Sequence, residues 1–298
     1  MLNHFPPQPL AAAEQAGAAF AARVGATSLA DLRALPARQL LDSAGKAGTP
    51  RFGFTLDGHF FRQLPAATYA AGEQARVPLL VGWNSEESGP DGLMGKEEIT
   101  VASYTRKVRE LYGARADEAL RLYPAPTDAA ARQAATDLAS DRFMGYGTWK
   151  WAELHARTSG QPVYRYLFAK PRPPMVPALA GATPGRAGGI DKSTVGSKPQ
   201  TPARGAVHSA EIEYALGNLA TNKVYAWTPD DYQVSGQMLG YFANFVKTGD
   251  PSGSLKPKWP AFNGPAGGAP VLRLDVQSRV EPEPHRARYE WLDQVAGK

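Results

Sequence analysis

The pattern of apolar and polar positions along this chain predicts strands that alternate with longer helical stretches. The clearest strand is the continuous apolar run Val77–Gly82, which is bounded by turn-forming residues. Such a run is typical of a strand buried on both faces of a sheet. Further strands are predicted at Phe52–Leu56, Val163–Phe168 and Val271–Leu274. Strands alternating with helices indicate an α/β fold with a mostly parallel sheet flanked by helices.

Helical spacing of apolar residues accounts for most of the remaining chain. Helices are predicted at residues 8–24, from Ser28, from Pro36 to about Ala44, from Thr100 to about His155 with a break at residues 124–126, at 230–247 and at 285–295. Residues 171–204 are rich in proline and glycine, and a loop of this length is usually functional or mobile. No internal repeat and no linker interrupts the sequence, so we expect residues 1–298 to form a single domain.

The composition supports a soluble globular protein. The chain has 298 residues, of which 43% are hydrophobic and 10% aromatic, enough to bury a substantial core. This aromatic content excludes global disorder. There is no apolar run of about 18 residues, so no membrane span is predicted. Glu14 interrupts the apolar N-terminal stretch and no basic residues precede it, so no signal peptide is predicted and the compartment stays open.

The distribution of charge argues against a nucleic-acid partner, and the cysteine and histidine content argues against a metal or cofactor site. The net charge is +5, from 33 basic and 28 acidic residues, and basic side chains are interleaved with acids, as in Arg106–Glu110. Nucleic-acid binding needs a clustered basic face. The absence of cysteine excludes disulfides, thiol nucleophiles and thiolate metal sites. The five histidines form no His-Glu-x-x-His motif, so we expect neither a metal nor a cofactor.

Two acidic residues follow the clearest strand. Glu86 and Glu87 come just past its carboxyl end, where open α/β sheets gather their functional groups. A solvated turn that caps the next helix would explain the same residues.

A histidine stands between the long loop and an acidic segment. His208 lies in the stretch 205–214, where an imidazole on a loop could act as a general base. A structural role for a lone histidine is the alternative. Of the other four, His4 lies near the terminus, His155 and His285 fall in helical patterns that look exposed, and His59 is expected to pack among Phe60 and Phe61.

Around these residues the sequence resembles the type B carboxylesterases, which include cholinesterases and bacterial para-nitrobenzyl-type esterases. The resemblance covers nearly the whole chain. Besides the segments around Glu87 and His208, its motifs are Tyr164–Phe168, Asn244–Pro251, Lys258–Phe262 and His285–Arg288.

The resemblance implies an α/β-hydrolase fold with a Ser–Glu–His triad in that chain order. Glu87 falls on the position of the triad acid and His208 on that of the triad base. Glu211 falls on a second, buried glutamate beside the triad. Glu86 does not align with the acid and is interpreted as its solvent-facing neighbour.

The nucleophile of the family has no counterpart here. No serine has a glycine two residues before it, so the Gly-x-Ser-x-Gly elbow is missing, as is the His-Gly-Gly segment of the oxyanion hole. Asp42–Gly45 resembles the elbow core, but Leu41 replaces its first glycine and the preceding residues look helical. We therefore interpret Ser43 as part of a helix C-terminus and the chain as the C-terminal portion of the fold, with the N-terminal half missing.

Three hypotheses follow. The first is the acid-and-base half of a serine carboxylesterase acting on a small carboxylic ester, inactive without its nucleophile half. The alternative from another class is an esterase-like binding module without catalysis, and the third is a small hydrolase built around Ser43. Half a sheet exposes apolar edges, so we expect poor solubility, self-association or pairing with the missing half. Residues 171–204 are a candidate wall of the site. Trp149, Trp151 and Trp227 could line the substrate pocket, but we expect each of them to pack in the core.

Overall fold

The structure is a computed structural model that describes residues 7–49, 52–184, 190–191, 193, 203–264 and 269–296. The described part of the chain divides into two compact units, one within residues 5–73 and the other within residues 74–298. Each unit is described separately below.

The smaller unit is mainly helical. Its elements are β1 (Gln8–Pro9), α1 (Leu10–Arg23), α2 (Leu29–Ala34), α3 (Ala37–Ala44), β2 (Thr55–Leu56) and α4 (Pro65–Ala71). The hydroxyl of Ser28 accepts a hydrogen bond from the backbone of Asp31 and caps the second helix, which confirms the helix predicted from Ser28. Phe20 is buried, and its ring packs edge-on against Phe52 with 5.3 Å between centroids. The predicted strand at 52–56 is shorter than expected and pairs in parallel with β1.

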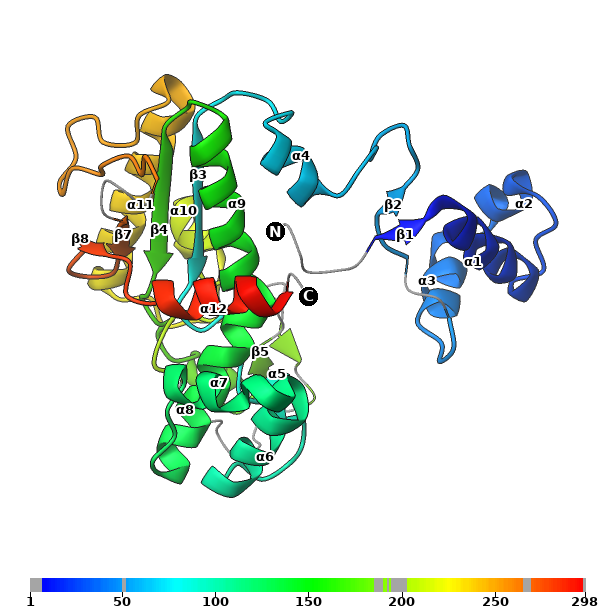
Figure 1. Cartoon of the computed structure of the whole chain (residues 1–298), viewed down its shortest axis with the longest axis horizontal. Coiled ribbons are helices and arrows are strands. Elements are labelled where there is room, and N and C mark those ends of the chain that lie inside the picture. The colour runs from blue at the N-terminus through cyan, green and yellow to red at the C-terminus, as the bar shows by residue number, and fades with distance from the viewer. Residues whose placement is uncertain are drawn as a thin grey trace. The chain divides into compact units, whose positions relative to one another are not determined.

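The larger unit is built on a four-stranded sheet with the order β3-β4-β7-β8. The strands are β3 (Leu79–Asn84), β4 (Val163–Phe168), β7 (Pro270–Leu274) and β8 (Arg279–Pro282). The first three are parallel and β8 is antiparallel to β7, which confirms the mostly parallel sheet. Figure 1 shows β3 and β4 side by side and pointing the same way. A two-residue antiparallel pair, β5 (Thr183–Pro184) with β6 (Ile190–Asp191), lies outside this sheet.

The larger unit also contains helices. They are α5 (Asp91–Met94), α6 (Val101–Tyr112), α7 (Ala116–Leu122), α8 (Asp128–Ser140), α9 (Tyr146–Thr158), α10 (Ile212–Ala215), α11 (Pro229–Thr248) and α12 (Arg286–Ala296). Threonine side chains cap α6, α8 and α11, and each accepts a backbone hydrogen bond from the first turn. Helix α11 ends at Gly249, whose φ of 77° is favourable for glycine. The break predicted at residues 124–126 is confirmed.

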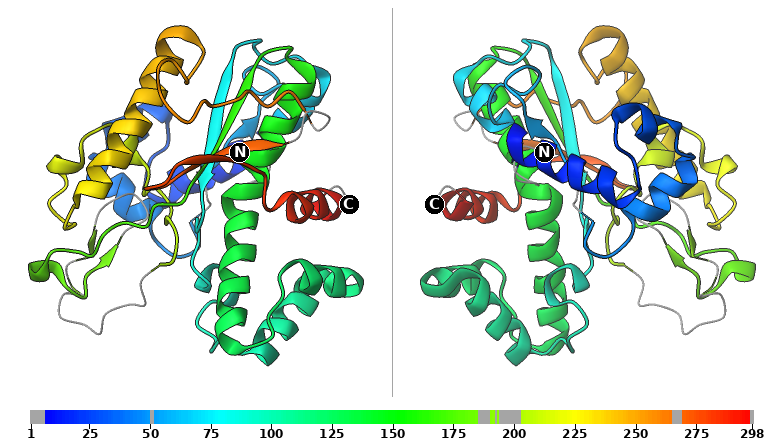
Figure 2. Two further views of the ribbon diagram at one scale, coloured as in Figure 1. Left: turned by 90° about the vertical axis from the view of Figure 1, so that its left-hand side faces the viewer. Right: turned by 90° about the vertical axis from the view of Figure 1, so that its right-hand side faces the viewer.

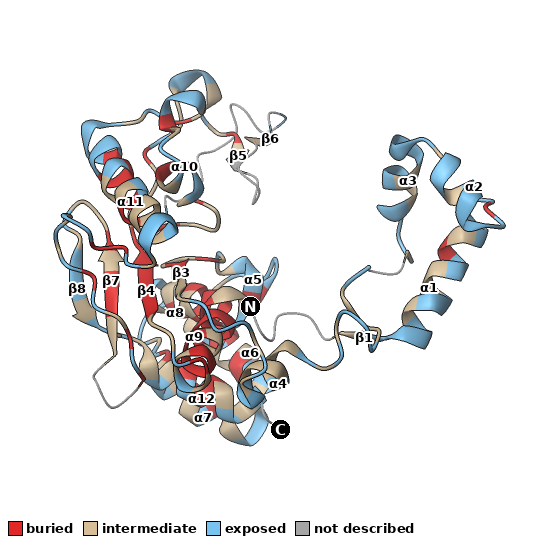
Figure 3. Ribbon diagram, turned by 90° about the horizontal axis from the view of Figure 1, so that it is seen from above, coloured by how far each residue is buried: buried red, intermediate tan, exposed pale blue. Residues whose placement is uncertain are grey.

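Strand β4 is buried along its whole length because helices cover both faces of the sheet (Figures 2 and 3). Its residues Tyr164, Tyr166 and Phe168 pack with the buried side of α11, whereas Val163 and Leu167 belong to clusters that contain residues of α9. Gly82 of β3 lies directly against the ring of Tyr166, where an added Cβ would collide.

A charged cluster is buried beside β4. The Arg165 side chain is fully buried, and its guanidinium lies 3.2 Å from Glu283 and over the ring of Phe262. Arg286 bonds Glu283 at 3.1 Å and Glu153 at 2.8 Å. Buried charges are tolerated only when they are paired, so these contacts must form together.

We expect Glu283→Ala to lower the free energy of unfolding by about 3 kcal/mol, because Arg165 would keep its charge in a buried site without its nearest carboxylate. Urea denaturation followed by tryptophan fluorescence measures this loss. The matched control is Glu290→Ala, which removes a half-exposed partner of Arg286 and should cost less than about 1 kcal/mol. Equal losses for the two variants would contradict the importance of the buried cluster.

Candidate active site

The candidate site forms where residues 204–208 run alongside the carboxyl end of β3. Glu86 pairs with Val207 as a parallel bridge, and the Glu86 N–H donates to the carbonyl of Ala206 at 2.8 Å. The Ala206 N–H in turn donates to the hydroxyl of Ser85 at 2.9 Å. This pairing extends the sheet by a short segment and delivers His208 to the end of β3.

Gly205 permits this close approach. A Cβ at this position would collide with the Ser85 side chain, so only glycine lets the two segments lie this close. The side chain of Glu86 accepts the backbone N–H of Arg204 at 3.2 Å. Glu86 therefore ties down the incoming segment and is only partly exposed.

Glu87 and His208 form the central contact of the site. The Nδ1 atom of His208 lies 2.6 Å from Oε2 of Glu87. The other carboxylate oxygen, Oε1, accepts the backbone N–H of Asn84 at 2.7 Å, so both oxygens are engaged. The Glu87 side chain is 4% exposed and that of His208 is 28% exposed. The imidazole is thus held at one nitrogen by a buried carboxylate while part of its ring reaches the surface.

A π-helix supplies a further neighbour of His208. Residues Asp141–Gly145 form a π-helical turn between α8 and α9, and Phe143 on this turn contacts the imidazole edge-on at 5.1 Å between centroids. Such turns are frequent at functional sites. Phe143 could not be predicted from the sequence, because a single π-helical turn leaves no period in the pattern of apolar residues.

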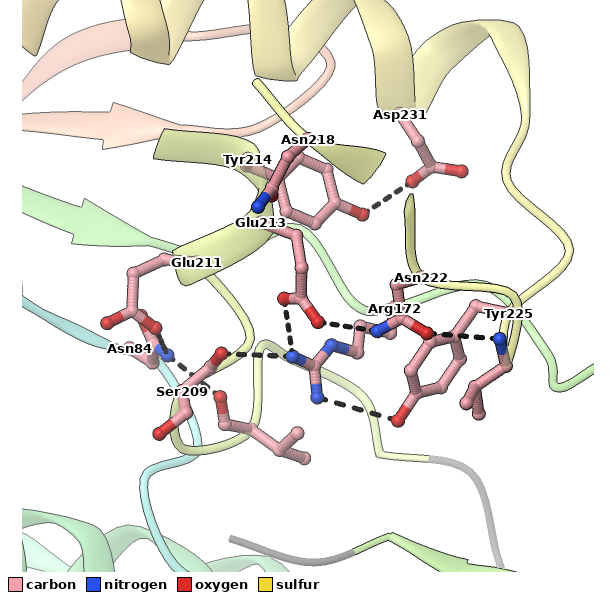
Figure 4. Close-up of polar contacts among 12 residues, drawn as sticks. Asn84, Arg172, Ser209, Glu211, Glu213, Tyr214, Asn218, Asn222, Tyr225 and Asp231 are labelled. Atoms are coloured by element: carbon pink, nitrogen blue, oxygen red, sulfur yellow. Dashed lines mark hydrogen bonds and ion pairs between the residues drawn. The ribbon is translucent and has the colours of Figure 1, made fainter. Parts of the chain in front are cut away.

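Asn84 joins the strand to the second glutamate. Its side chain is buried, and Nδ2 donates both to the carbonyl of Val207 at 2.8 Å and to the carboxylate of Glu211 (Figure 4). Burial raises the pKa of Glu211, and the hydrogen bond from Asn84 offsets part of that rise. Asn84 could not be predicted as a site residue either, because its only signal in the sequence is an amide at the end of an apolar strand.

The family of the chain follows from its sequence and fold together. The sequence profile described as "Carboxylesterase family" matches residues 7–291. The chain belongs to the carboxylesterase family. It is 28% identical to carboxylesterase 4A of Bos taurus over 76% of this chain and 38% of that protein. It is 27% identical to fumonisin B1 esterase of Sphingopyxis macrogoltabida over 70% of this chain and 35% of that protein.

The fold of this carboxylesterase-family chain is the α/β-hydrolase fold, as the resemblance implied. The solved structure of PNB esterase superposes with a TM-score of 0.63 at 20% identity, covering 96% of this chain and 55% of that one. The chain therefore spans only a little over half of that structure and less than half the length of the curated relatives named above.

Ser43 lies at the end of α3, in the smaller unit. Its segment Asp42–Gly45 is the last turn of a helix and its cap, which confirms the predicted helix C-terminus. Leu41, where the family elbow would need glycine, is 70% exposed on this helix. The local backbone is therefore not the strand–turn–helix bend that presents a nucleophile.

Three expectations about other histidines were wrong. His155 is buried, not exposed, and its Nε2 lies 2.8 Å from the carbonyl of Val77. His59 is exposed instead of packed, and Phe60 beside it is 79% exposed. His285 is half-buried just before α12. Helical spacing alone could not show which side of each helix meets another element.

A small polar cavity of about 70 Å³ borders the end of β3. Asn84, Ser85, Asp141, His285 and Arg288 are among its lining residues. Burial raises the pKa of Asp141 to about 7, although Arg288 opposes the rise. Burial and the nearby charge of Arg288 lower the pKa of His285 to about 4.

Other expectations bear on the surroundings of the site. Trp149 is buried and Trp151 and Trp227 pack against core clusters, as expected. Of the loop 171–204, residues 185–189, 192 and 194–202 lie outside the described residues, so its role as a wall stays a prediction. Within the described ranges, no three His, Asp or Glu side chains are arranged to hold a metal ion. None of the described helices is long and apolar enough to cross a membrane.

We expect His285→Gln to reduce the acid sensitivity of the fold. His285 stays neutral in the folded state down to about pH 4, whereas in the unfolded chain it binds a proton below about pH 6.5. Stability is therefore lost as the pH falls from 6.5 toward 4. Urea denaturation at pH 7 and pH 5 should show a loss about 1–2 kcal/mol smaller in the variant than in the unmodified chain. The exposed His59→Gln is the control, and an unchanged pH dependence in His285→Gln would count against this assignment.

Proposed function

We propose that this chain supplies the acid and the base of a serine carboxylesterase whose nucleophile lies outside residues 1–298. The observation that carries the proposal is the 2.6 Å contact between Glu87 and Nδ1 of His208 at the carboxyl end of a parallel sheet. This is where α/β enzymes place their reacting groups. Carboxylesterase relatives make ester hydrolysis the reaction class that this pair would serve.

In the proposed mechanism Glu87 holds the Nδ1 proton of His208. The carboxylate fixes the tautomer that leaves Nε2 able to accept a proton, and it stabilises the imidazolium that forms. Nε2 takes the proton of the serine hydroxyl as the oxygen attacks the ester carbonyl. His208 then returns that proton to the leaving alcohol, and a water molecule hydrolyses the acyl-enzyme by the same route.

Glu211 and Asn84 are linked to the Glu87–His208 pair by hydrogen bonds. Asn84 touches all three segments of the site, through the carbonyl of Val207, the carboxylate of Glu211 and its own N–H to Glu87. Burial and the nearby Glu87 carboxylate raise the pKa of Glu211, whereas the hydrogen bond from Asn84 and the nearby His208 lower it. We infer that Glu211 orients the site and takes no proton from the substrate.

The sequence and the sheet both support a nucleophile from elsewhere. The chain contains no Gly-x-Ser-x-Gly, and the only serine that resembles an elbow, Ser43, lies at a helix end. In the part of the chain that the structure describes, β3 pairs with β4 on one edge and with no strand on the other. We propose that the missing nucleophile half adds its strands along this edge of β3.

The two compact units are proposed to belong to one carboxylesterase domain. The family profile runs from residue 7 to residue 291 and so includes residues of both units. The substrate is proposed to be a small carboxylic ester, and PNB esterase and fumonisin B1 esterase are both named as esterases.

We expect the protein alone to give a low-field proton NMR resonance from the Nδ1 proton of His208. Glu87→Gln and His208→Ala should each abolish it, because each removes one partner of the hydrogen bond. Glu86→Gln is the matched control, since that carboxylate binds the backbone of Arg204 instead, and the resonance should persist. If no such resonance exists in the unmodified chain, the acid–base pair is not formed.

A fluorophosphonate, which labels activated serines, then tests catalysis by intact mass. The chain alone should remain unlabelled. Mixed or co-expressed with the nucleophile-bearing half of PNB esterase, it should promote labelling of the serine on that half. His208→Ala should slow that labelling by at least about 1,000-fold.

Two outcomes would overturn the proposal in different ways. A His208-dependent adduct on Ser43 in the chain alone would establish a self-contained hydrolase. A folded complex of the two halves that never labels, with the His208 resonance intact, would favour the non-catalytic binding module.

A further inference from the structure

The backbone around His208 is held in an unfavourable conformation. Ser209, the next residue, has a φ of 64°, and it is the one non-glycine residue with positive φ in the described ranges. The Ala210 N–H donates to the carbonyl of Val207 at 3.0 Å and closes a tight turn over His208 and Ser209. Positive φ in a turn favours glycine, so a serine there needs support from its surroundings.

Side chains at and beyond the carboxyl ends of two neighbouring strands donate hydrogen bonds to the carbonyls on either side of His208. Asn84, at the end of β3, binds the carbonyl of Val207 at 2.8 Å. Arg172, four residues past the end of β4, binds the carbonyl of Ser209 through Nη2 at 3.0 Å. The position and direction of the imidazole therefore depend on both strand ends.

Arg172 is itself fixed in a buried network (Figure 4). Its side chain is 6% exposed, and Nη2 lies 2.7 Å from Oε2 of Glu213. The second oxygen of Glu213 accepts Nδ2 of Asn222 at 2.7 Å. The guanidinium also lies over the ring of Tyr225, 5.0 Å from its centroid, and reaches its hydroxyl at 3.5 Å.

Backbone pairing holds the two sides of this network together. Met175 and Tyr225 form an antiparallel bridge, and the Val176 N–H donates to the carbonyl of Val224 at 2.9 Å. The segment that follows Arg172 is therefore held by its own backbone pairing, independently of the turn at Ser209. A planar guanidinium can direct its N–H groups to the carbonyl, the carboxylate and the phenol at once, which a single ammonium on a flexible stem does less well.

We propose that Arg172 is a positioning residue for His208, holding the Ser209 turn so that Nδ1 meets Glu87. This inference rests on the proposed function, because it assigns Arg172 a role in the acid–base pair. Arg172 contacts neither Glu87 nor the reacting atoms, and it acts through the backbone of Ser209. Glu213 contributes to this positioning, because its carboxylate neutralises the Arg172 guanidinium and keeps it oriented toward Ser209.

The test is the exchange with water of the His208 Nδ1 proton, measured by NMR on the full chain. Arg172→Gln alone would leave Glu213 buried without a cation and could fail to fold. The double variant Arg172→Gln/Glu213→Gln removes both charges and still removes the bond to Ser209. We expect this variant to unfold cooperatively while the proton exchanges at least about tenfold faster or its resonance is lost. The single variant Arg172→Lys, with Glu213 unchanged, should exchange the His208 proton more slowly than the double variant and faster than the unmodified chain.

The control breaks another buried ion pair near the end of the same strand. Lys170, two residues past β4, binds Asp231 at 2.7 Å, and neither forms a hydrogen bond or ion pair with residues 207–209 among the described contacts. Lys170→Gln/Asp231→Asn should lower the melting temperature and leave the His208 proton unchanged. If both double variants leave the proton unchanged, or both speed its exchange equally, Arg172 has no positioning role. Absence of the resonance in the unmodified chain would instead overturn the acid–base pair itself.

Discussion

The short parallel pairing of residues 204–207 with the end of β3 is the contact on which the candidate site depends. Glu87 and His208 are separated by 121 positions in the chain, and closing so long a loop costs conformational entropy. The sheet supplies the compensation, because the Glu86 backbone and the Ser85 hydroxyl capture the incoming segment at Ala206. A slip of one residue in this pairing would turn the side chain of His208 away from Glu87.

Two buried arginines, one within β4 and one past its end, stabilise different parts of the larger unit. Arg165 is buried within β4 and pairs with Glu283, so its contribution is to the core of the sheet. Arg172 lies four residues past the end of β4 and pairs with Glu213, close to the turn at His208 and Ser209. Each pair needs both partners, because a buried charge without its partner is strongly destabilising. The Arg172–Glu213 pair therefore holds the guanidinium where it can bind the carbonyl of Ser209, next to His208.

The limits of sequence reasoning are clearest at the histidines. His208 and Glu87 could be found because recognisable motifs surround them. His155 looked exposed and is buried against Val77, whereas His59 looked packed and is exposed. Asn84 and Phe143 carried no signal that separates them from ordinary strand and helix residues. Each error arises because burial depends on which element arrives from elsewhere in the chain, and local periodicity does not contain that information.

The strands β3, β4 and β7 could be located from their apolar runs, because a strand buried on both faces requires such a run wherever it lies. The helix start at Ser28 and the missing serine elbow could also be predicted directly, since both are properties of a few adjacent residues. Other features could not be predicted from the sequence. They are the register that pairs Glu86 with Val207, the hydrogen bonds of Asn84 and Arg172 to the carbonyls beside His208, and the positive φ of Ser209. These features arise from contacts between residues far apart in the chain, and they exist only once the sheet has brought its strand ends together.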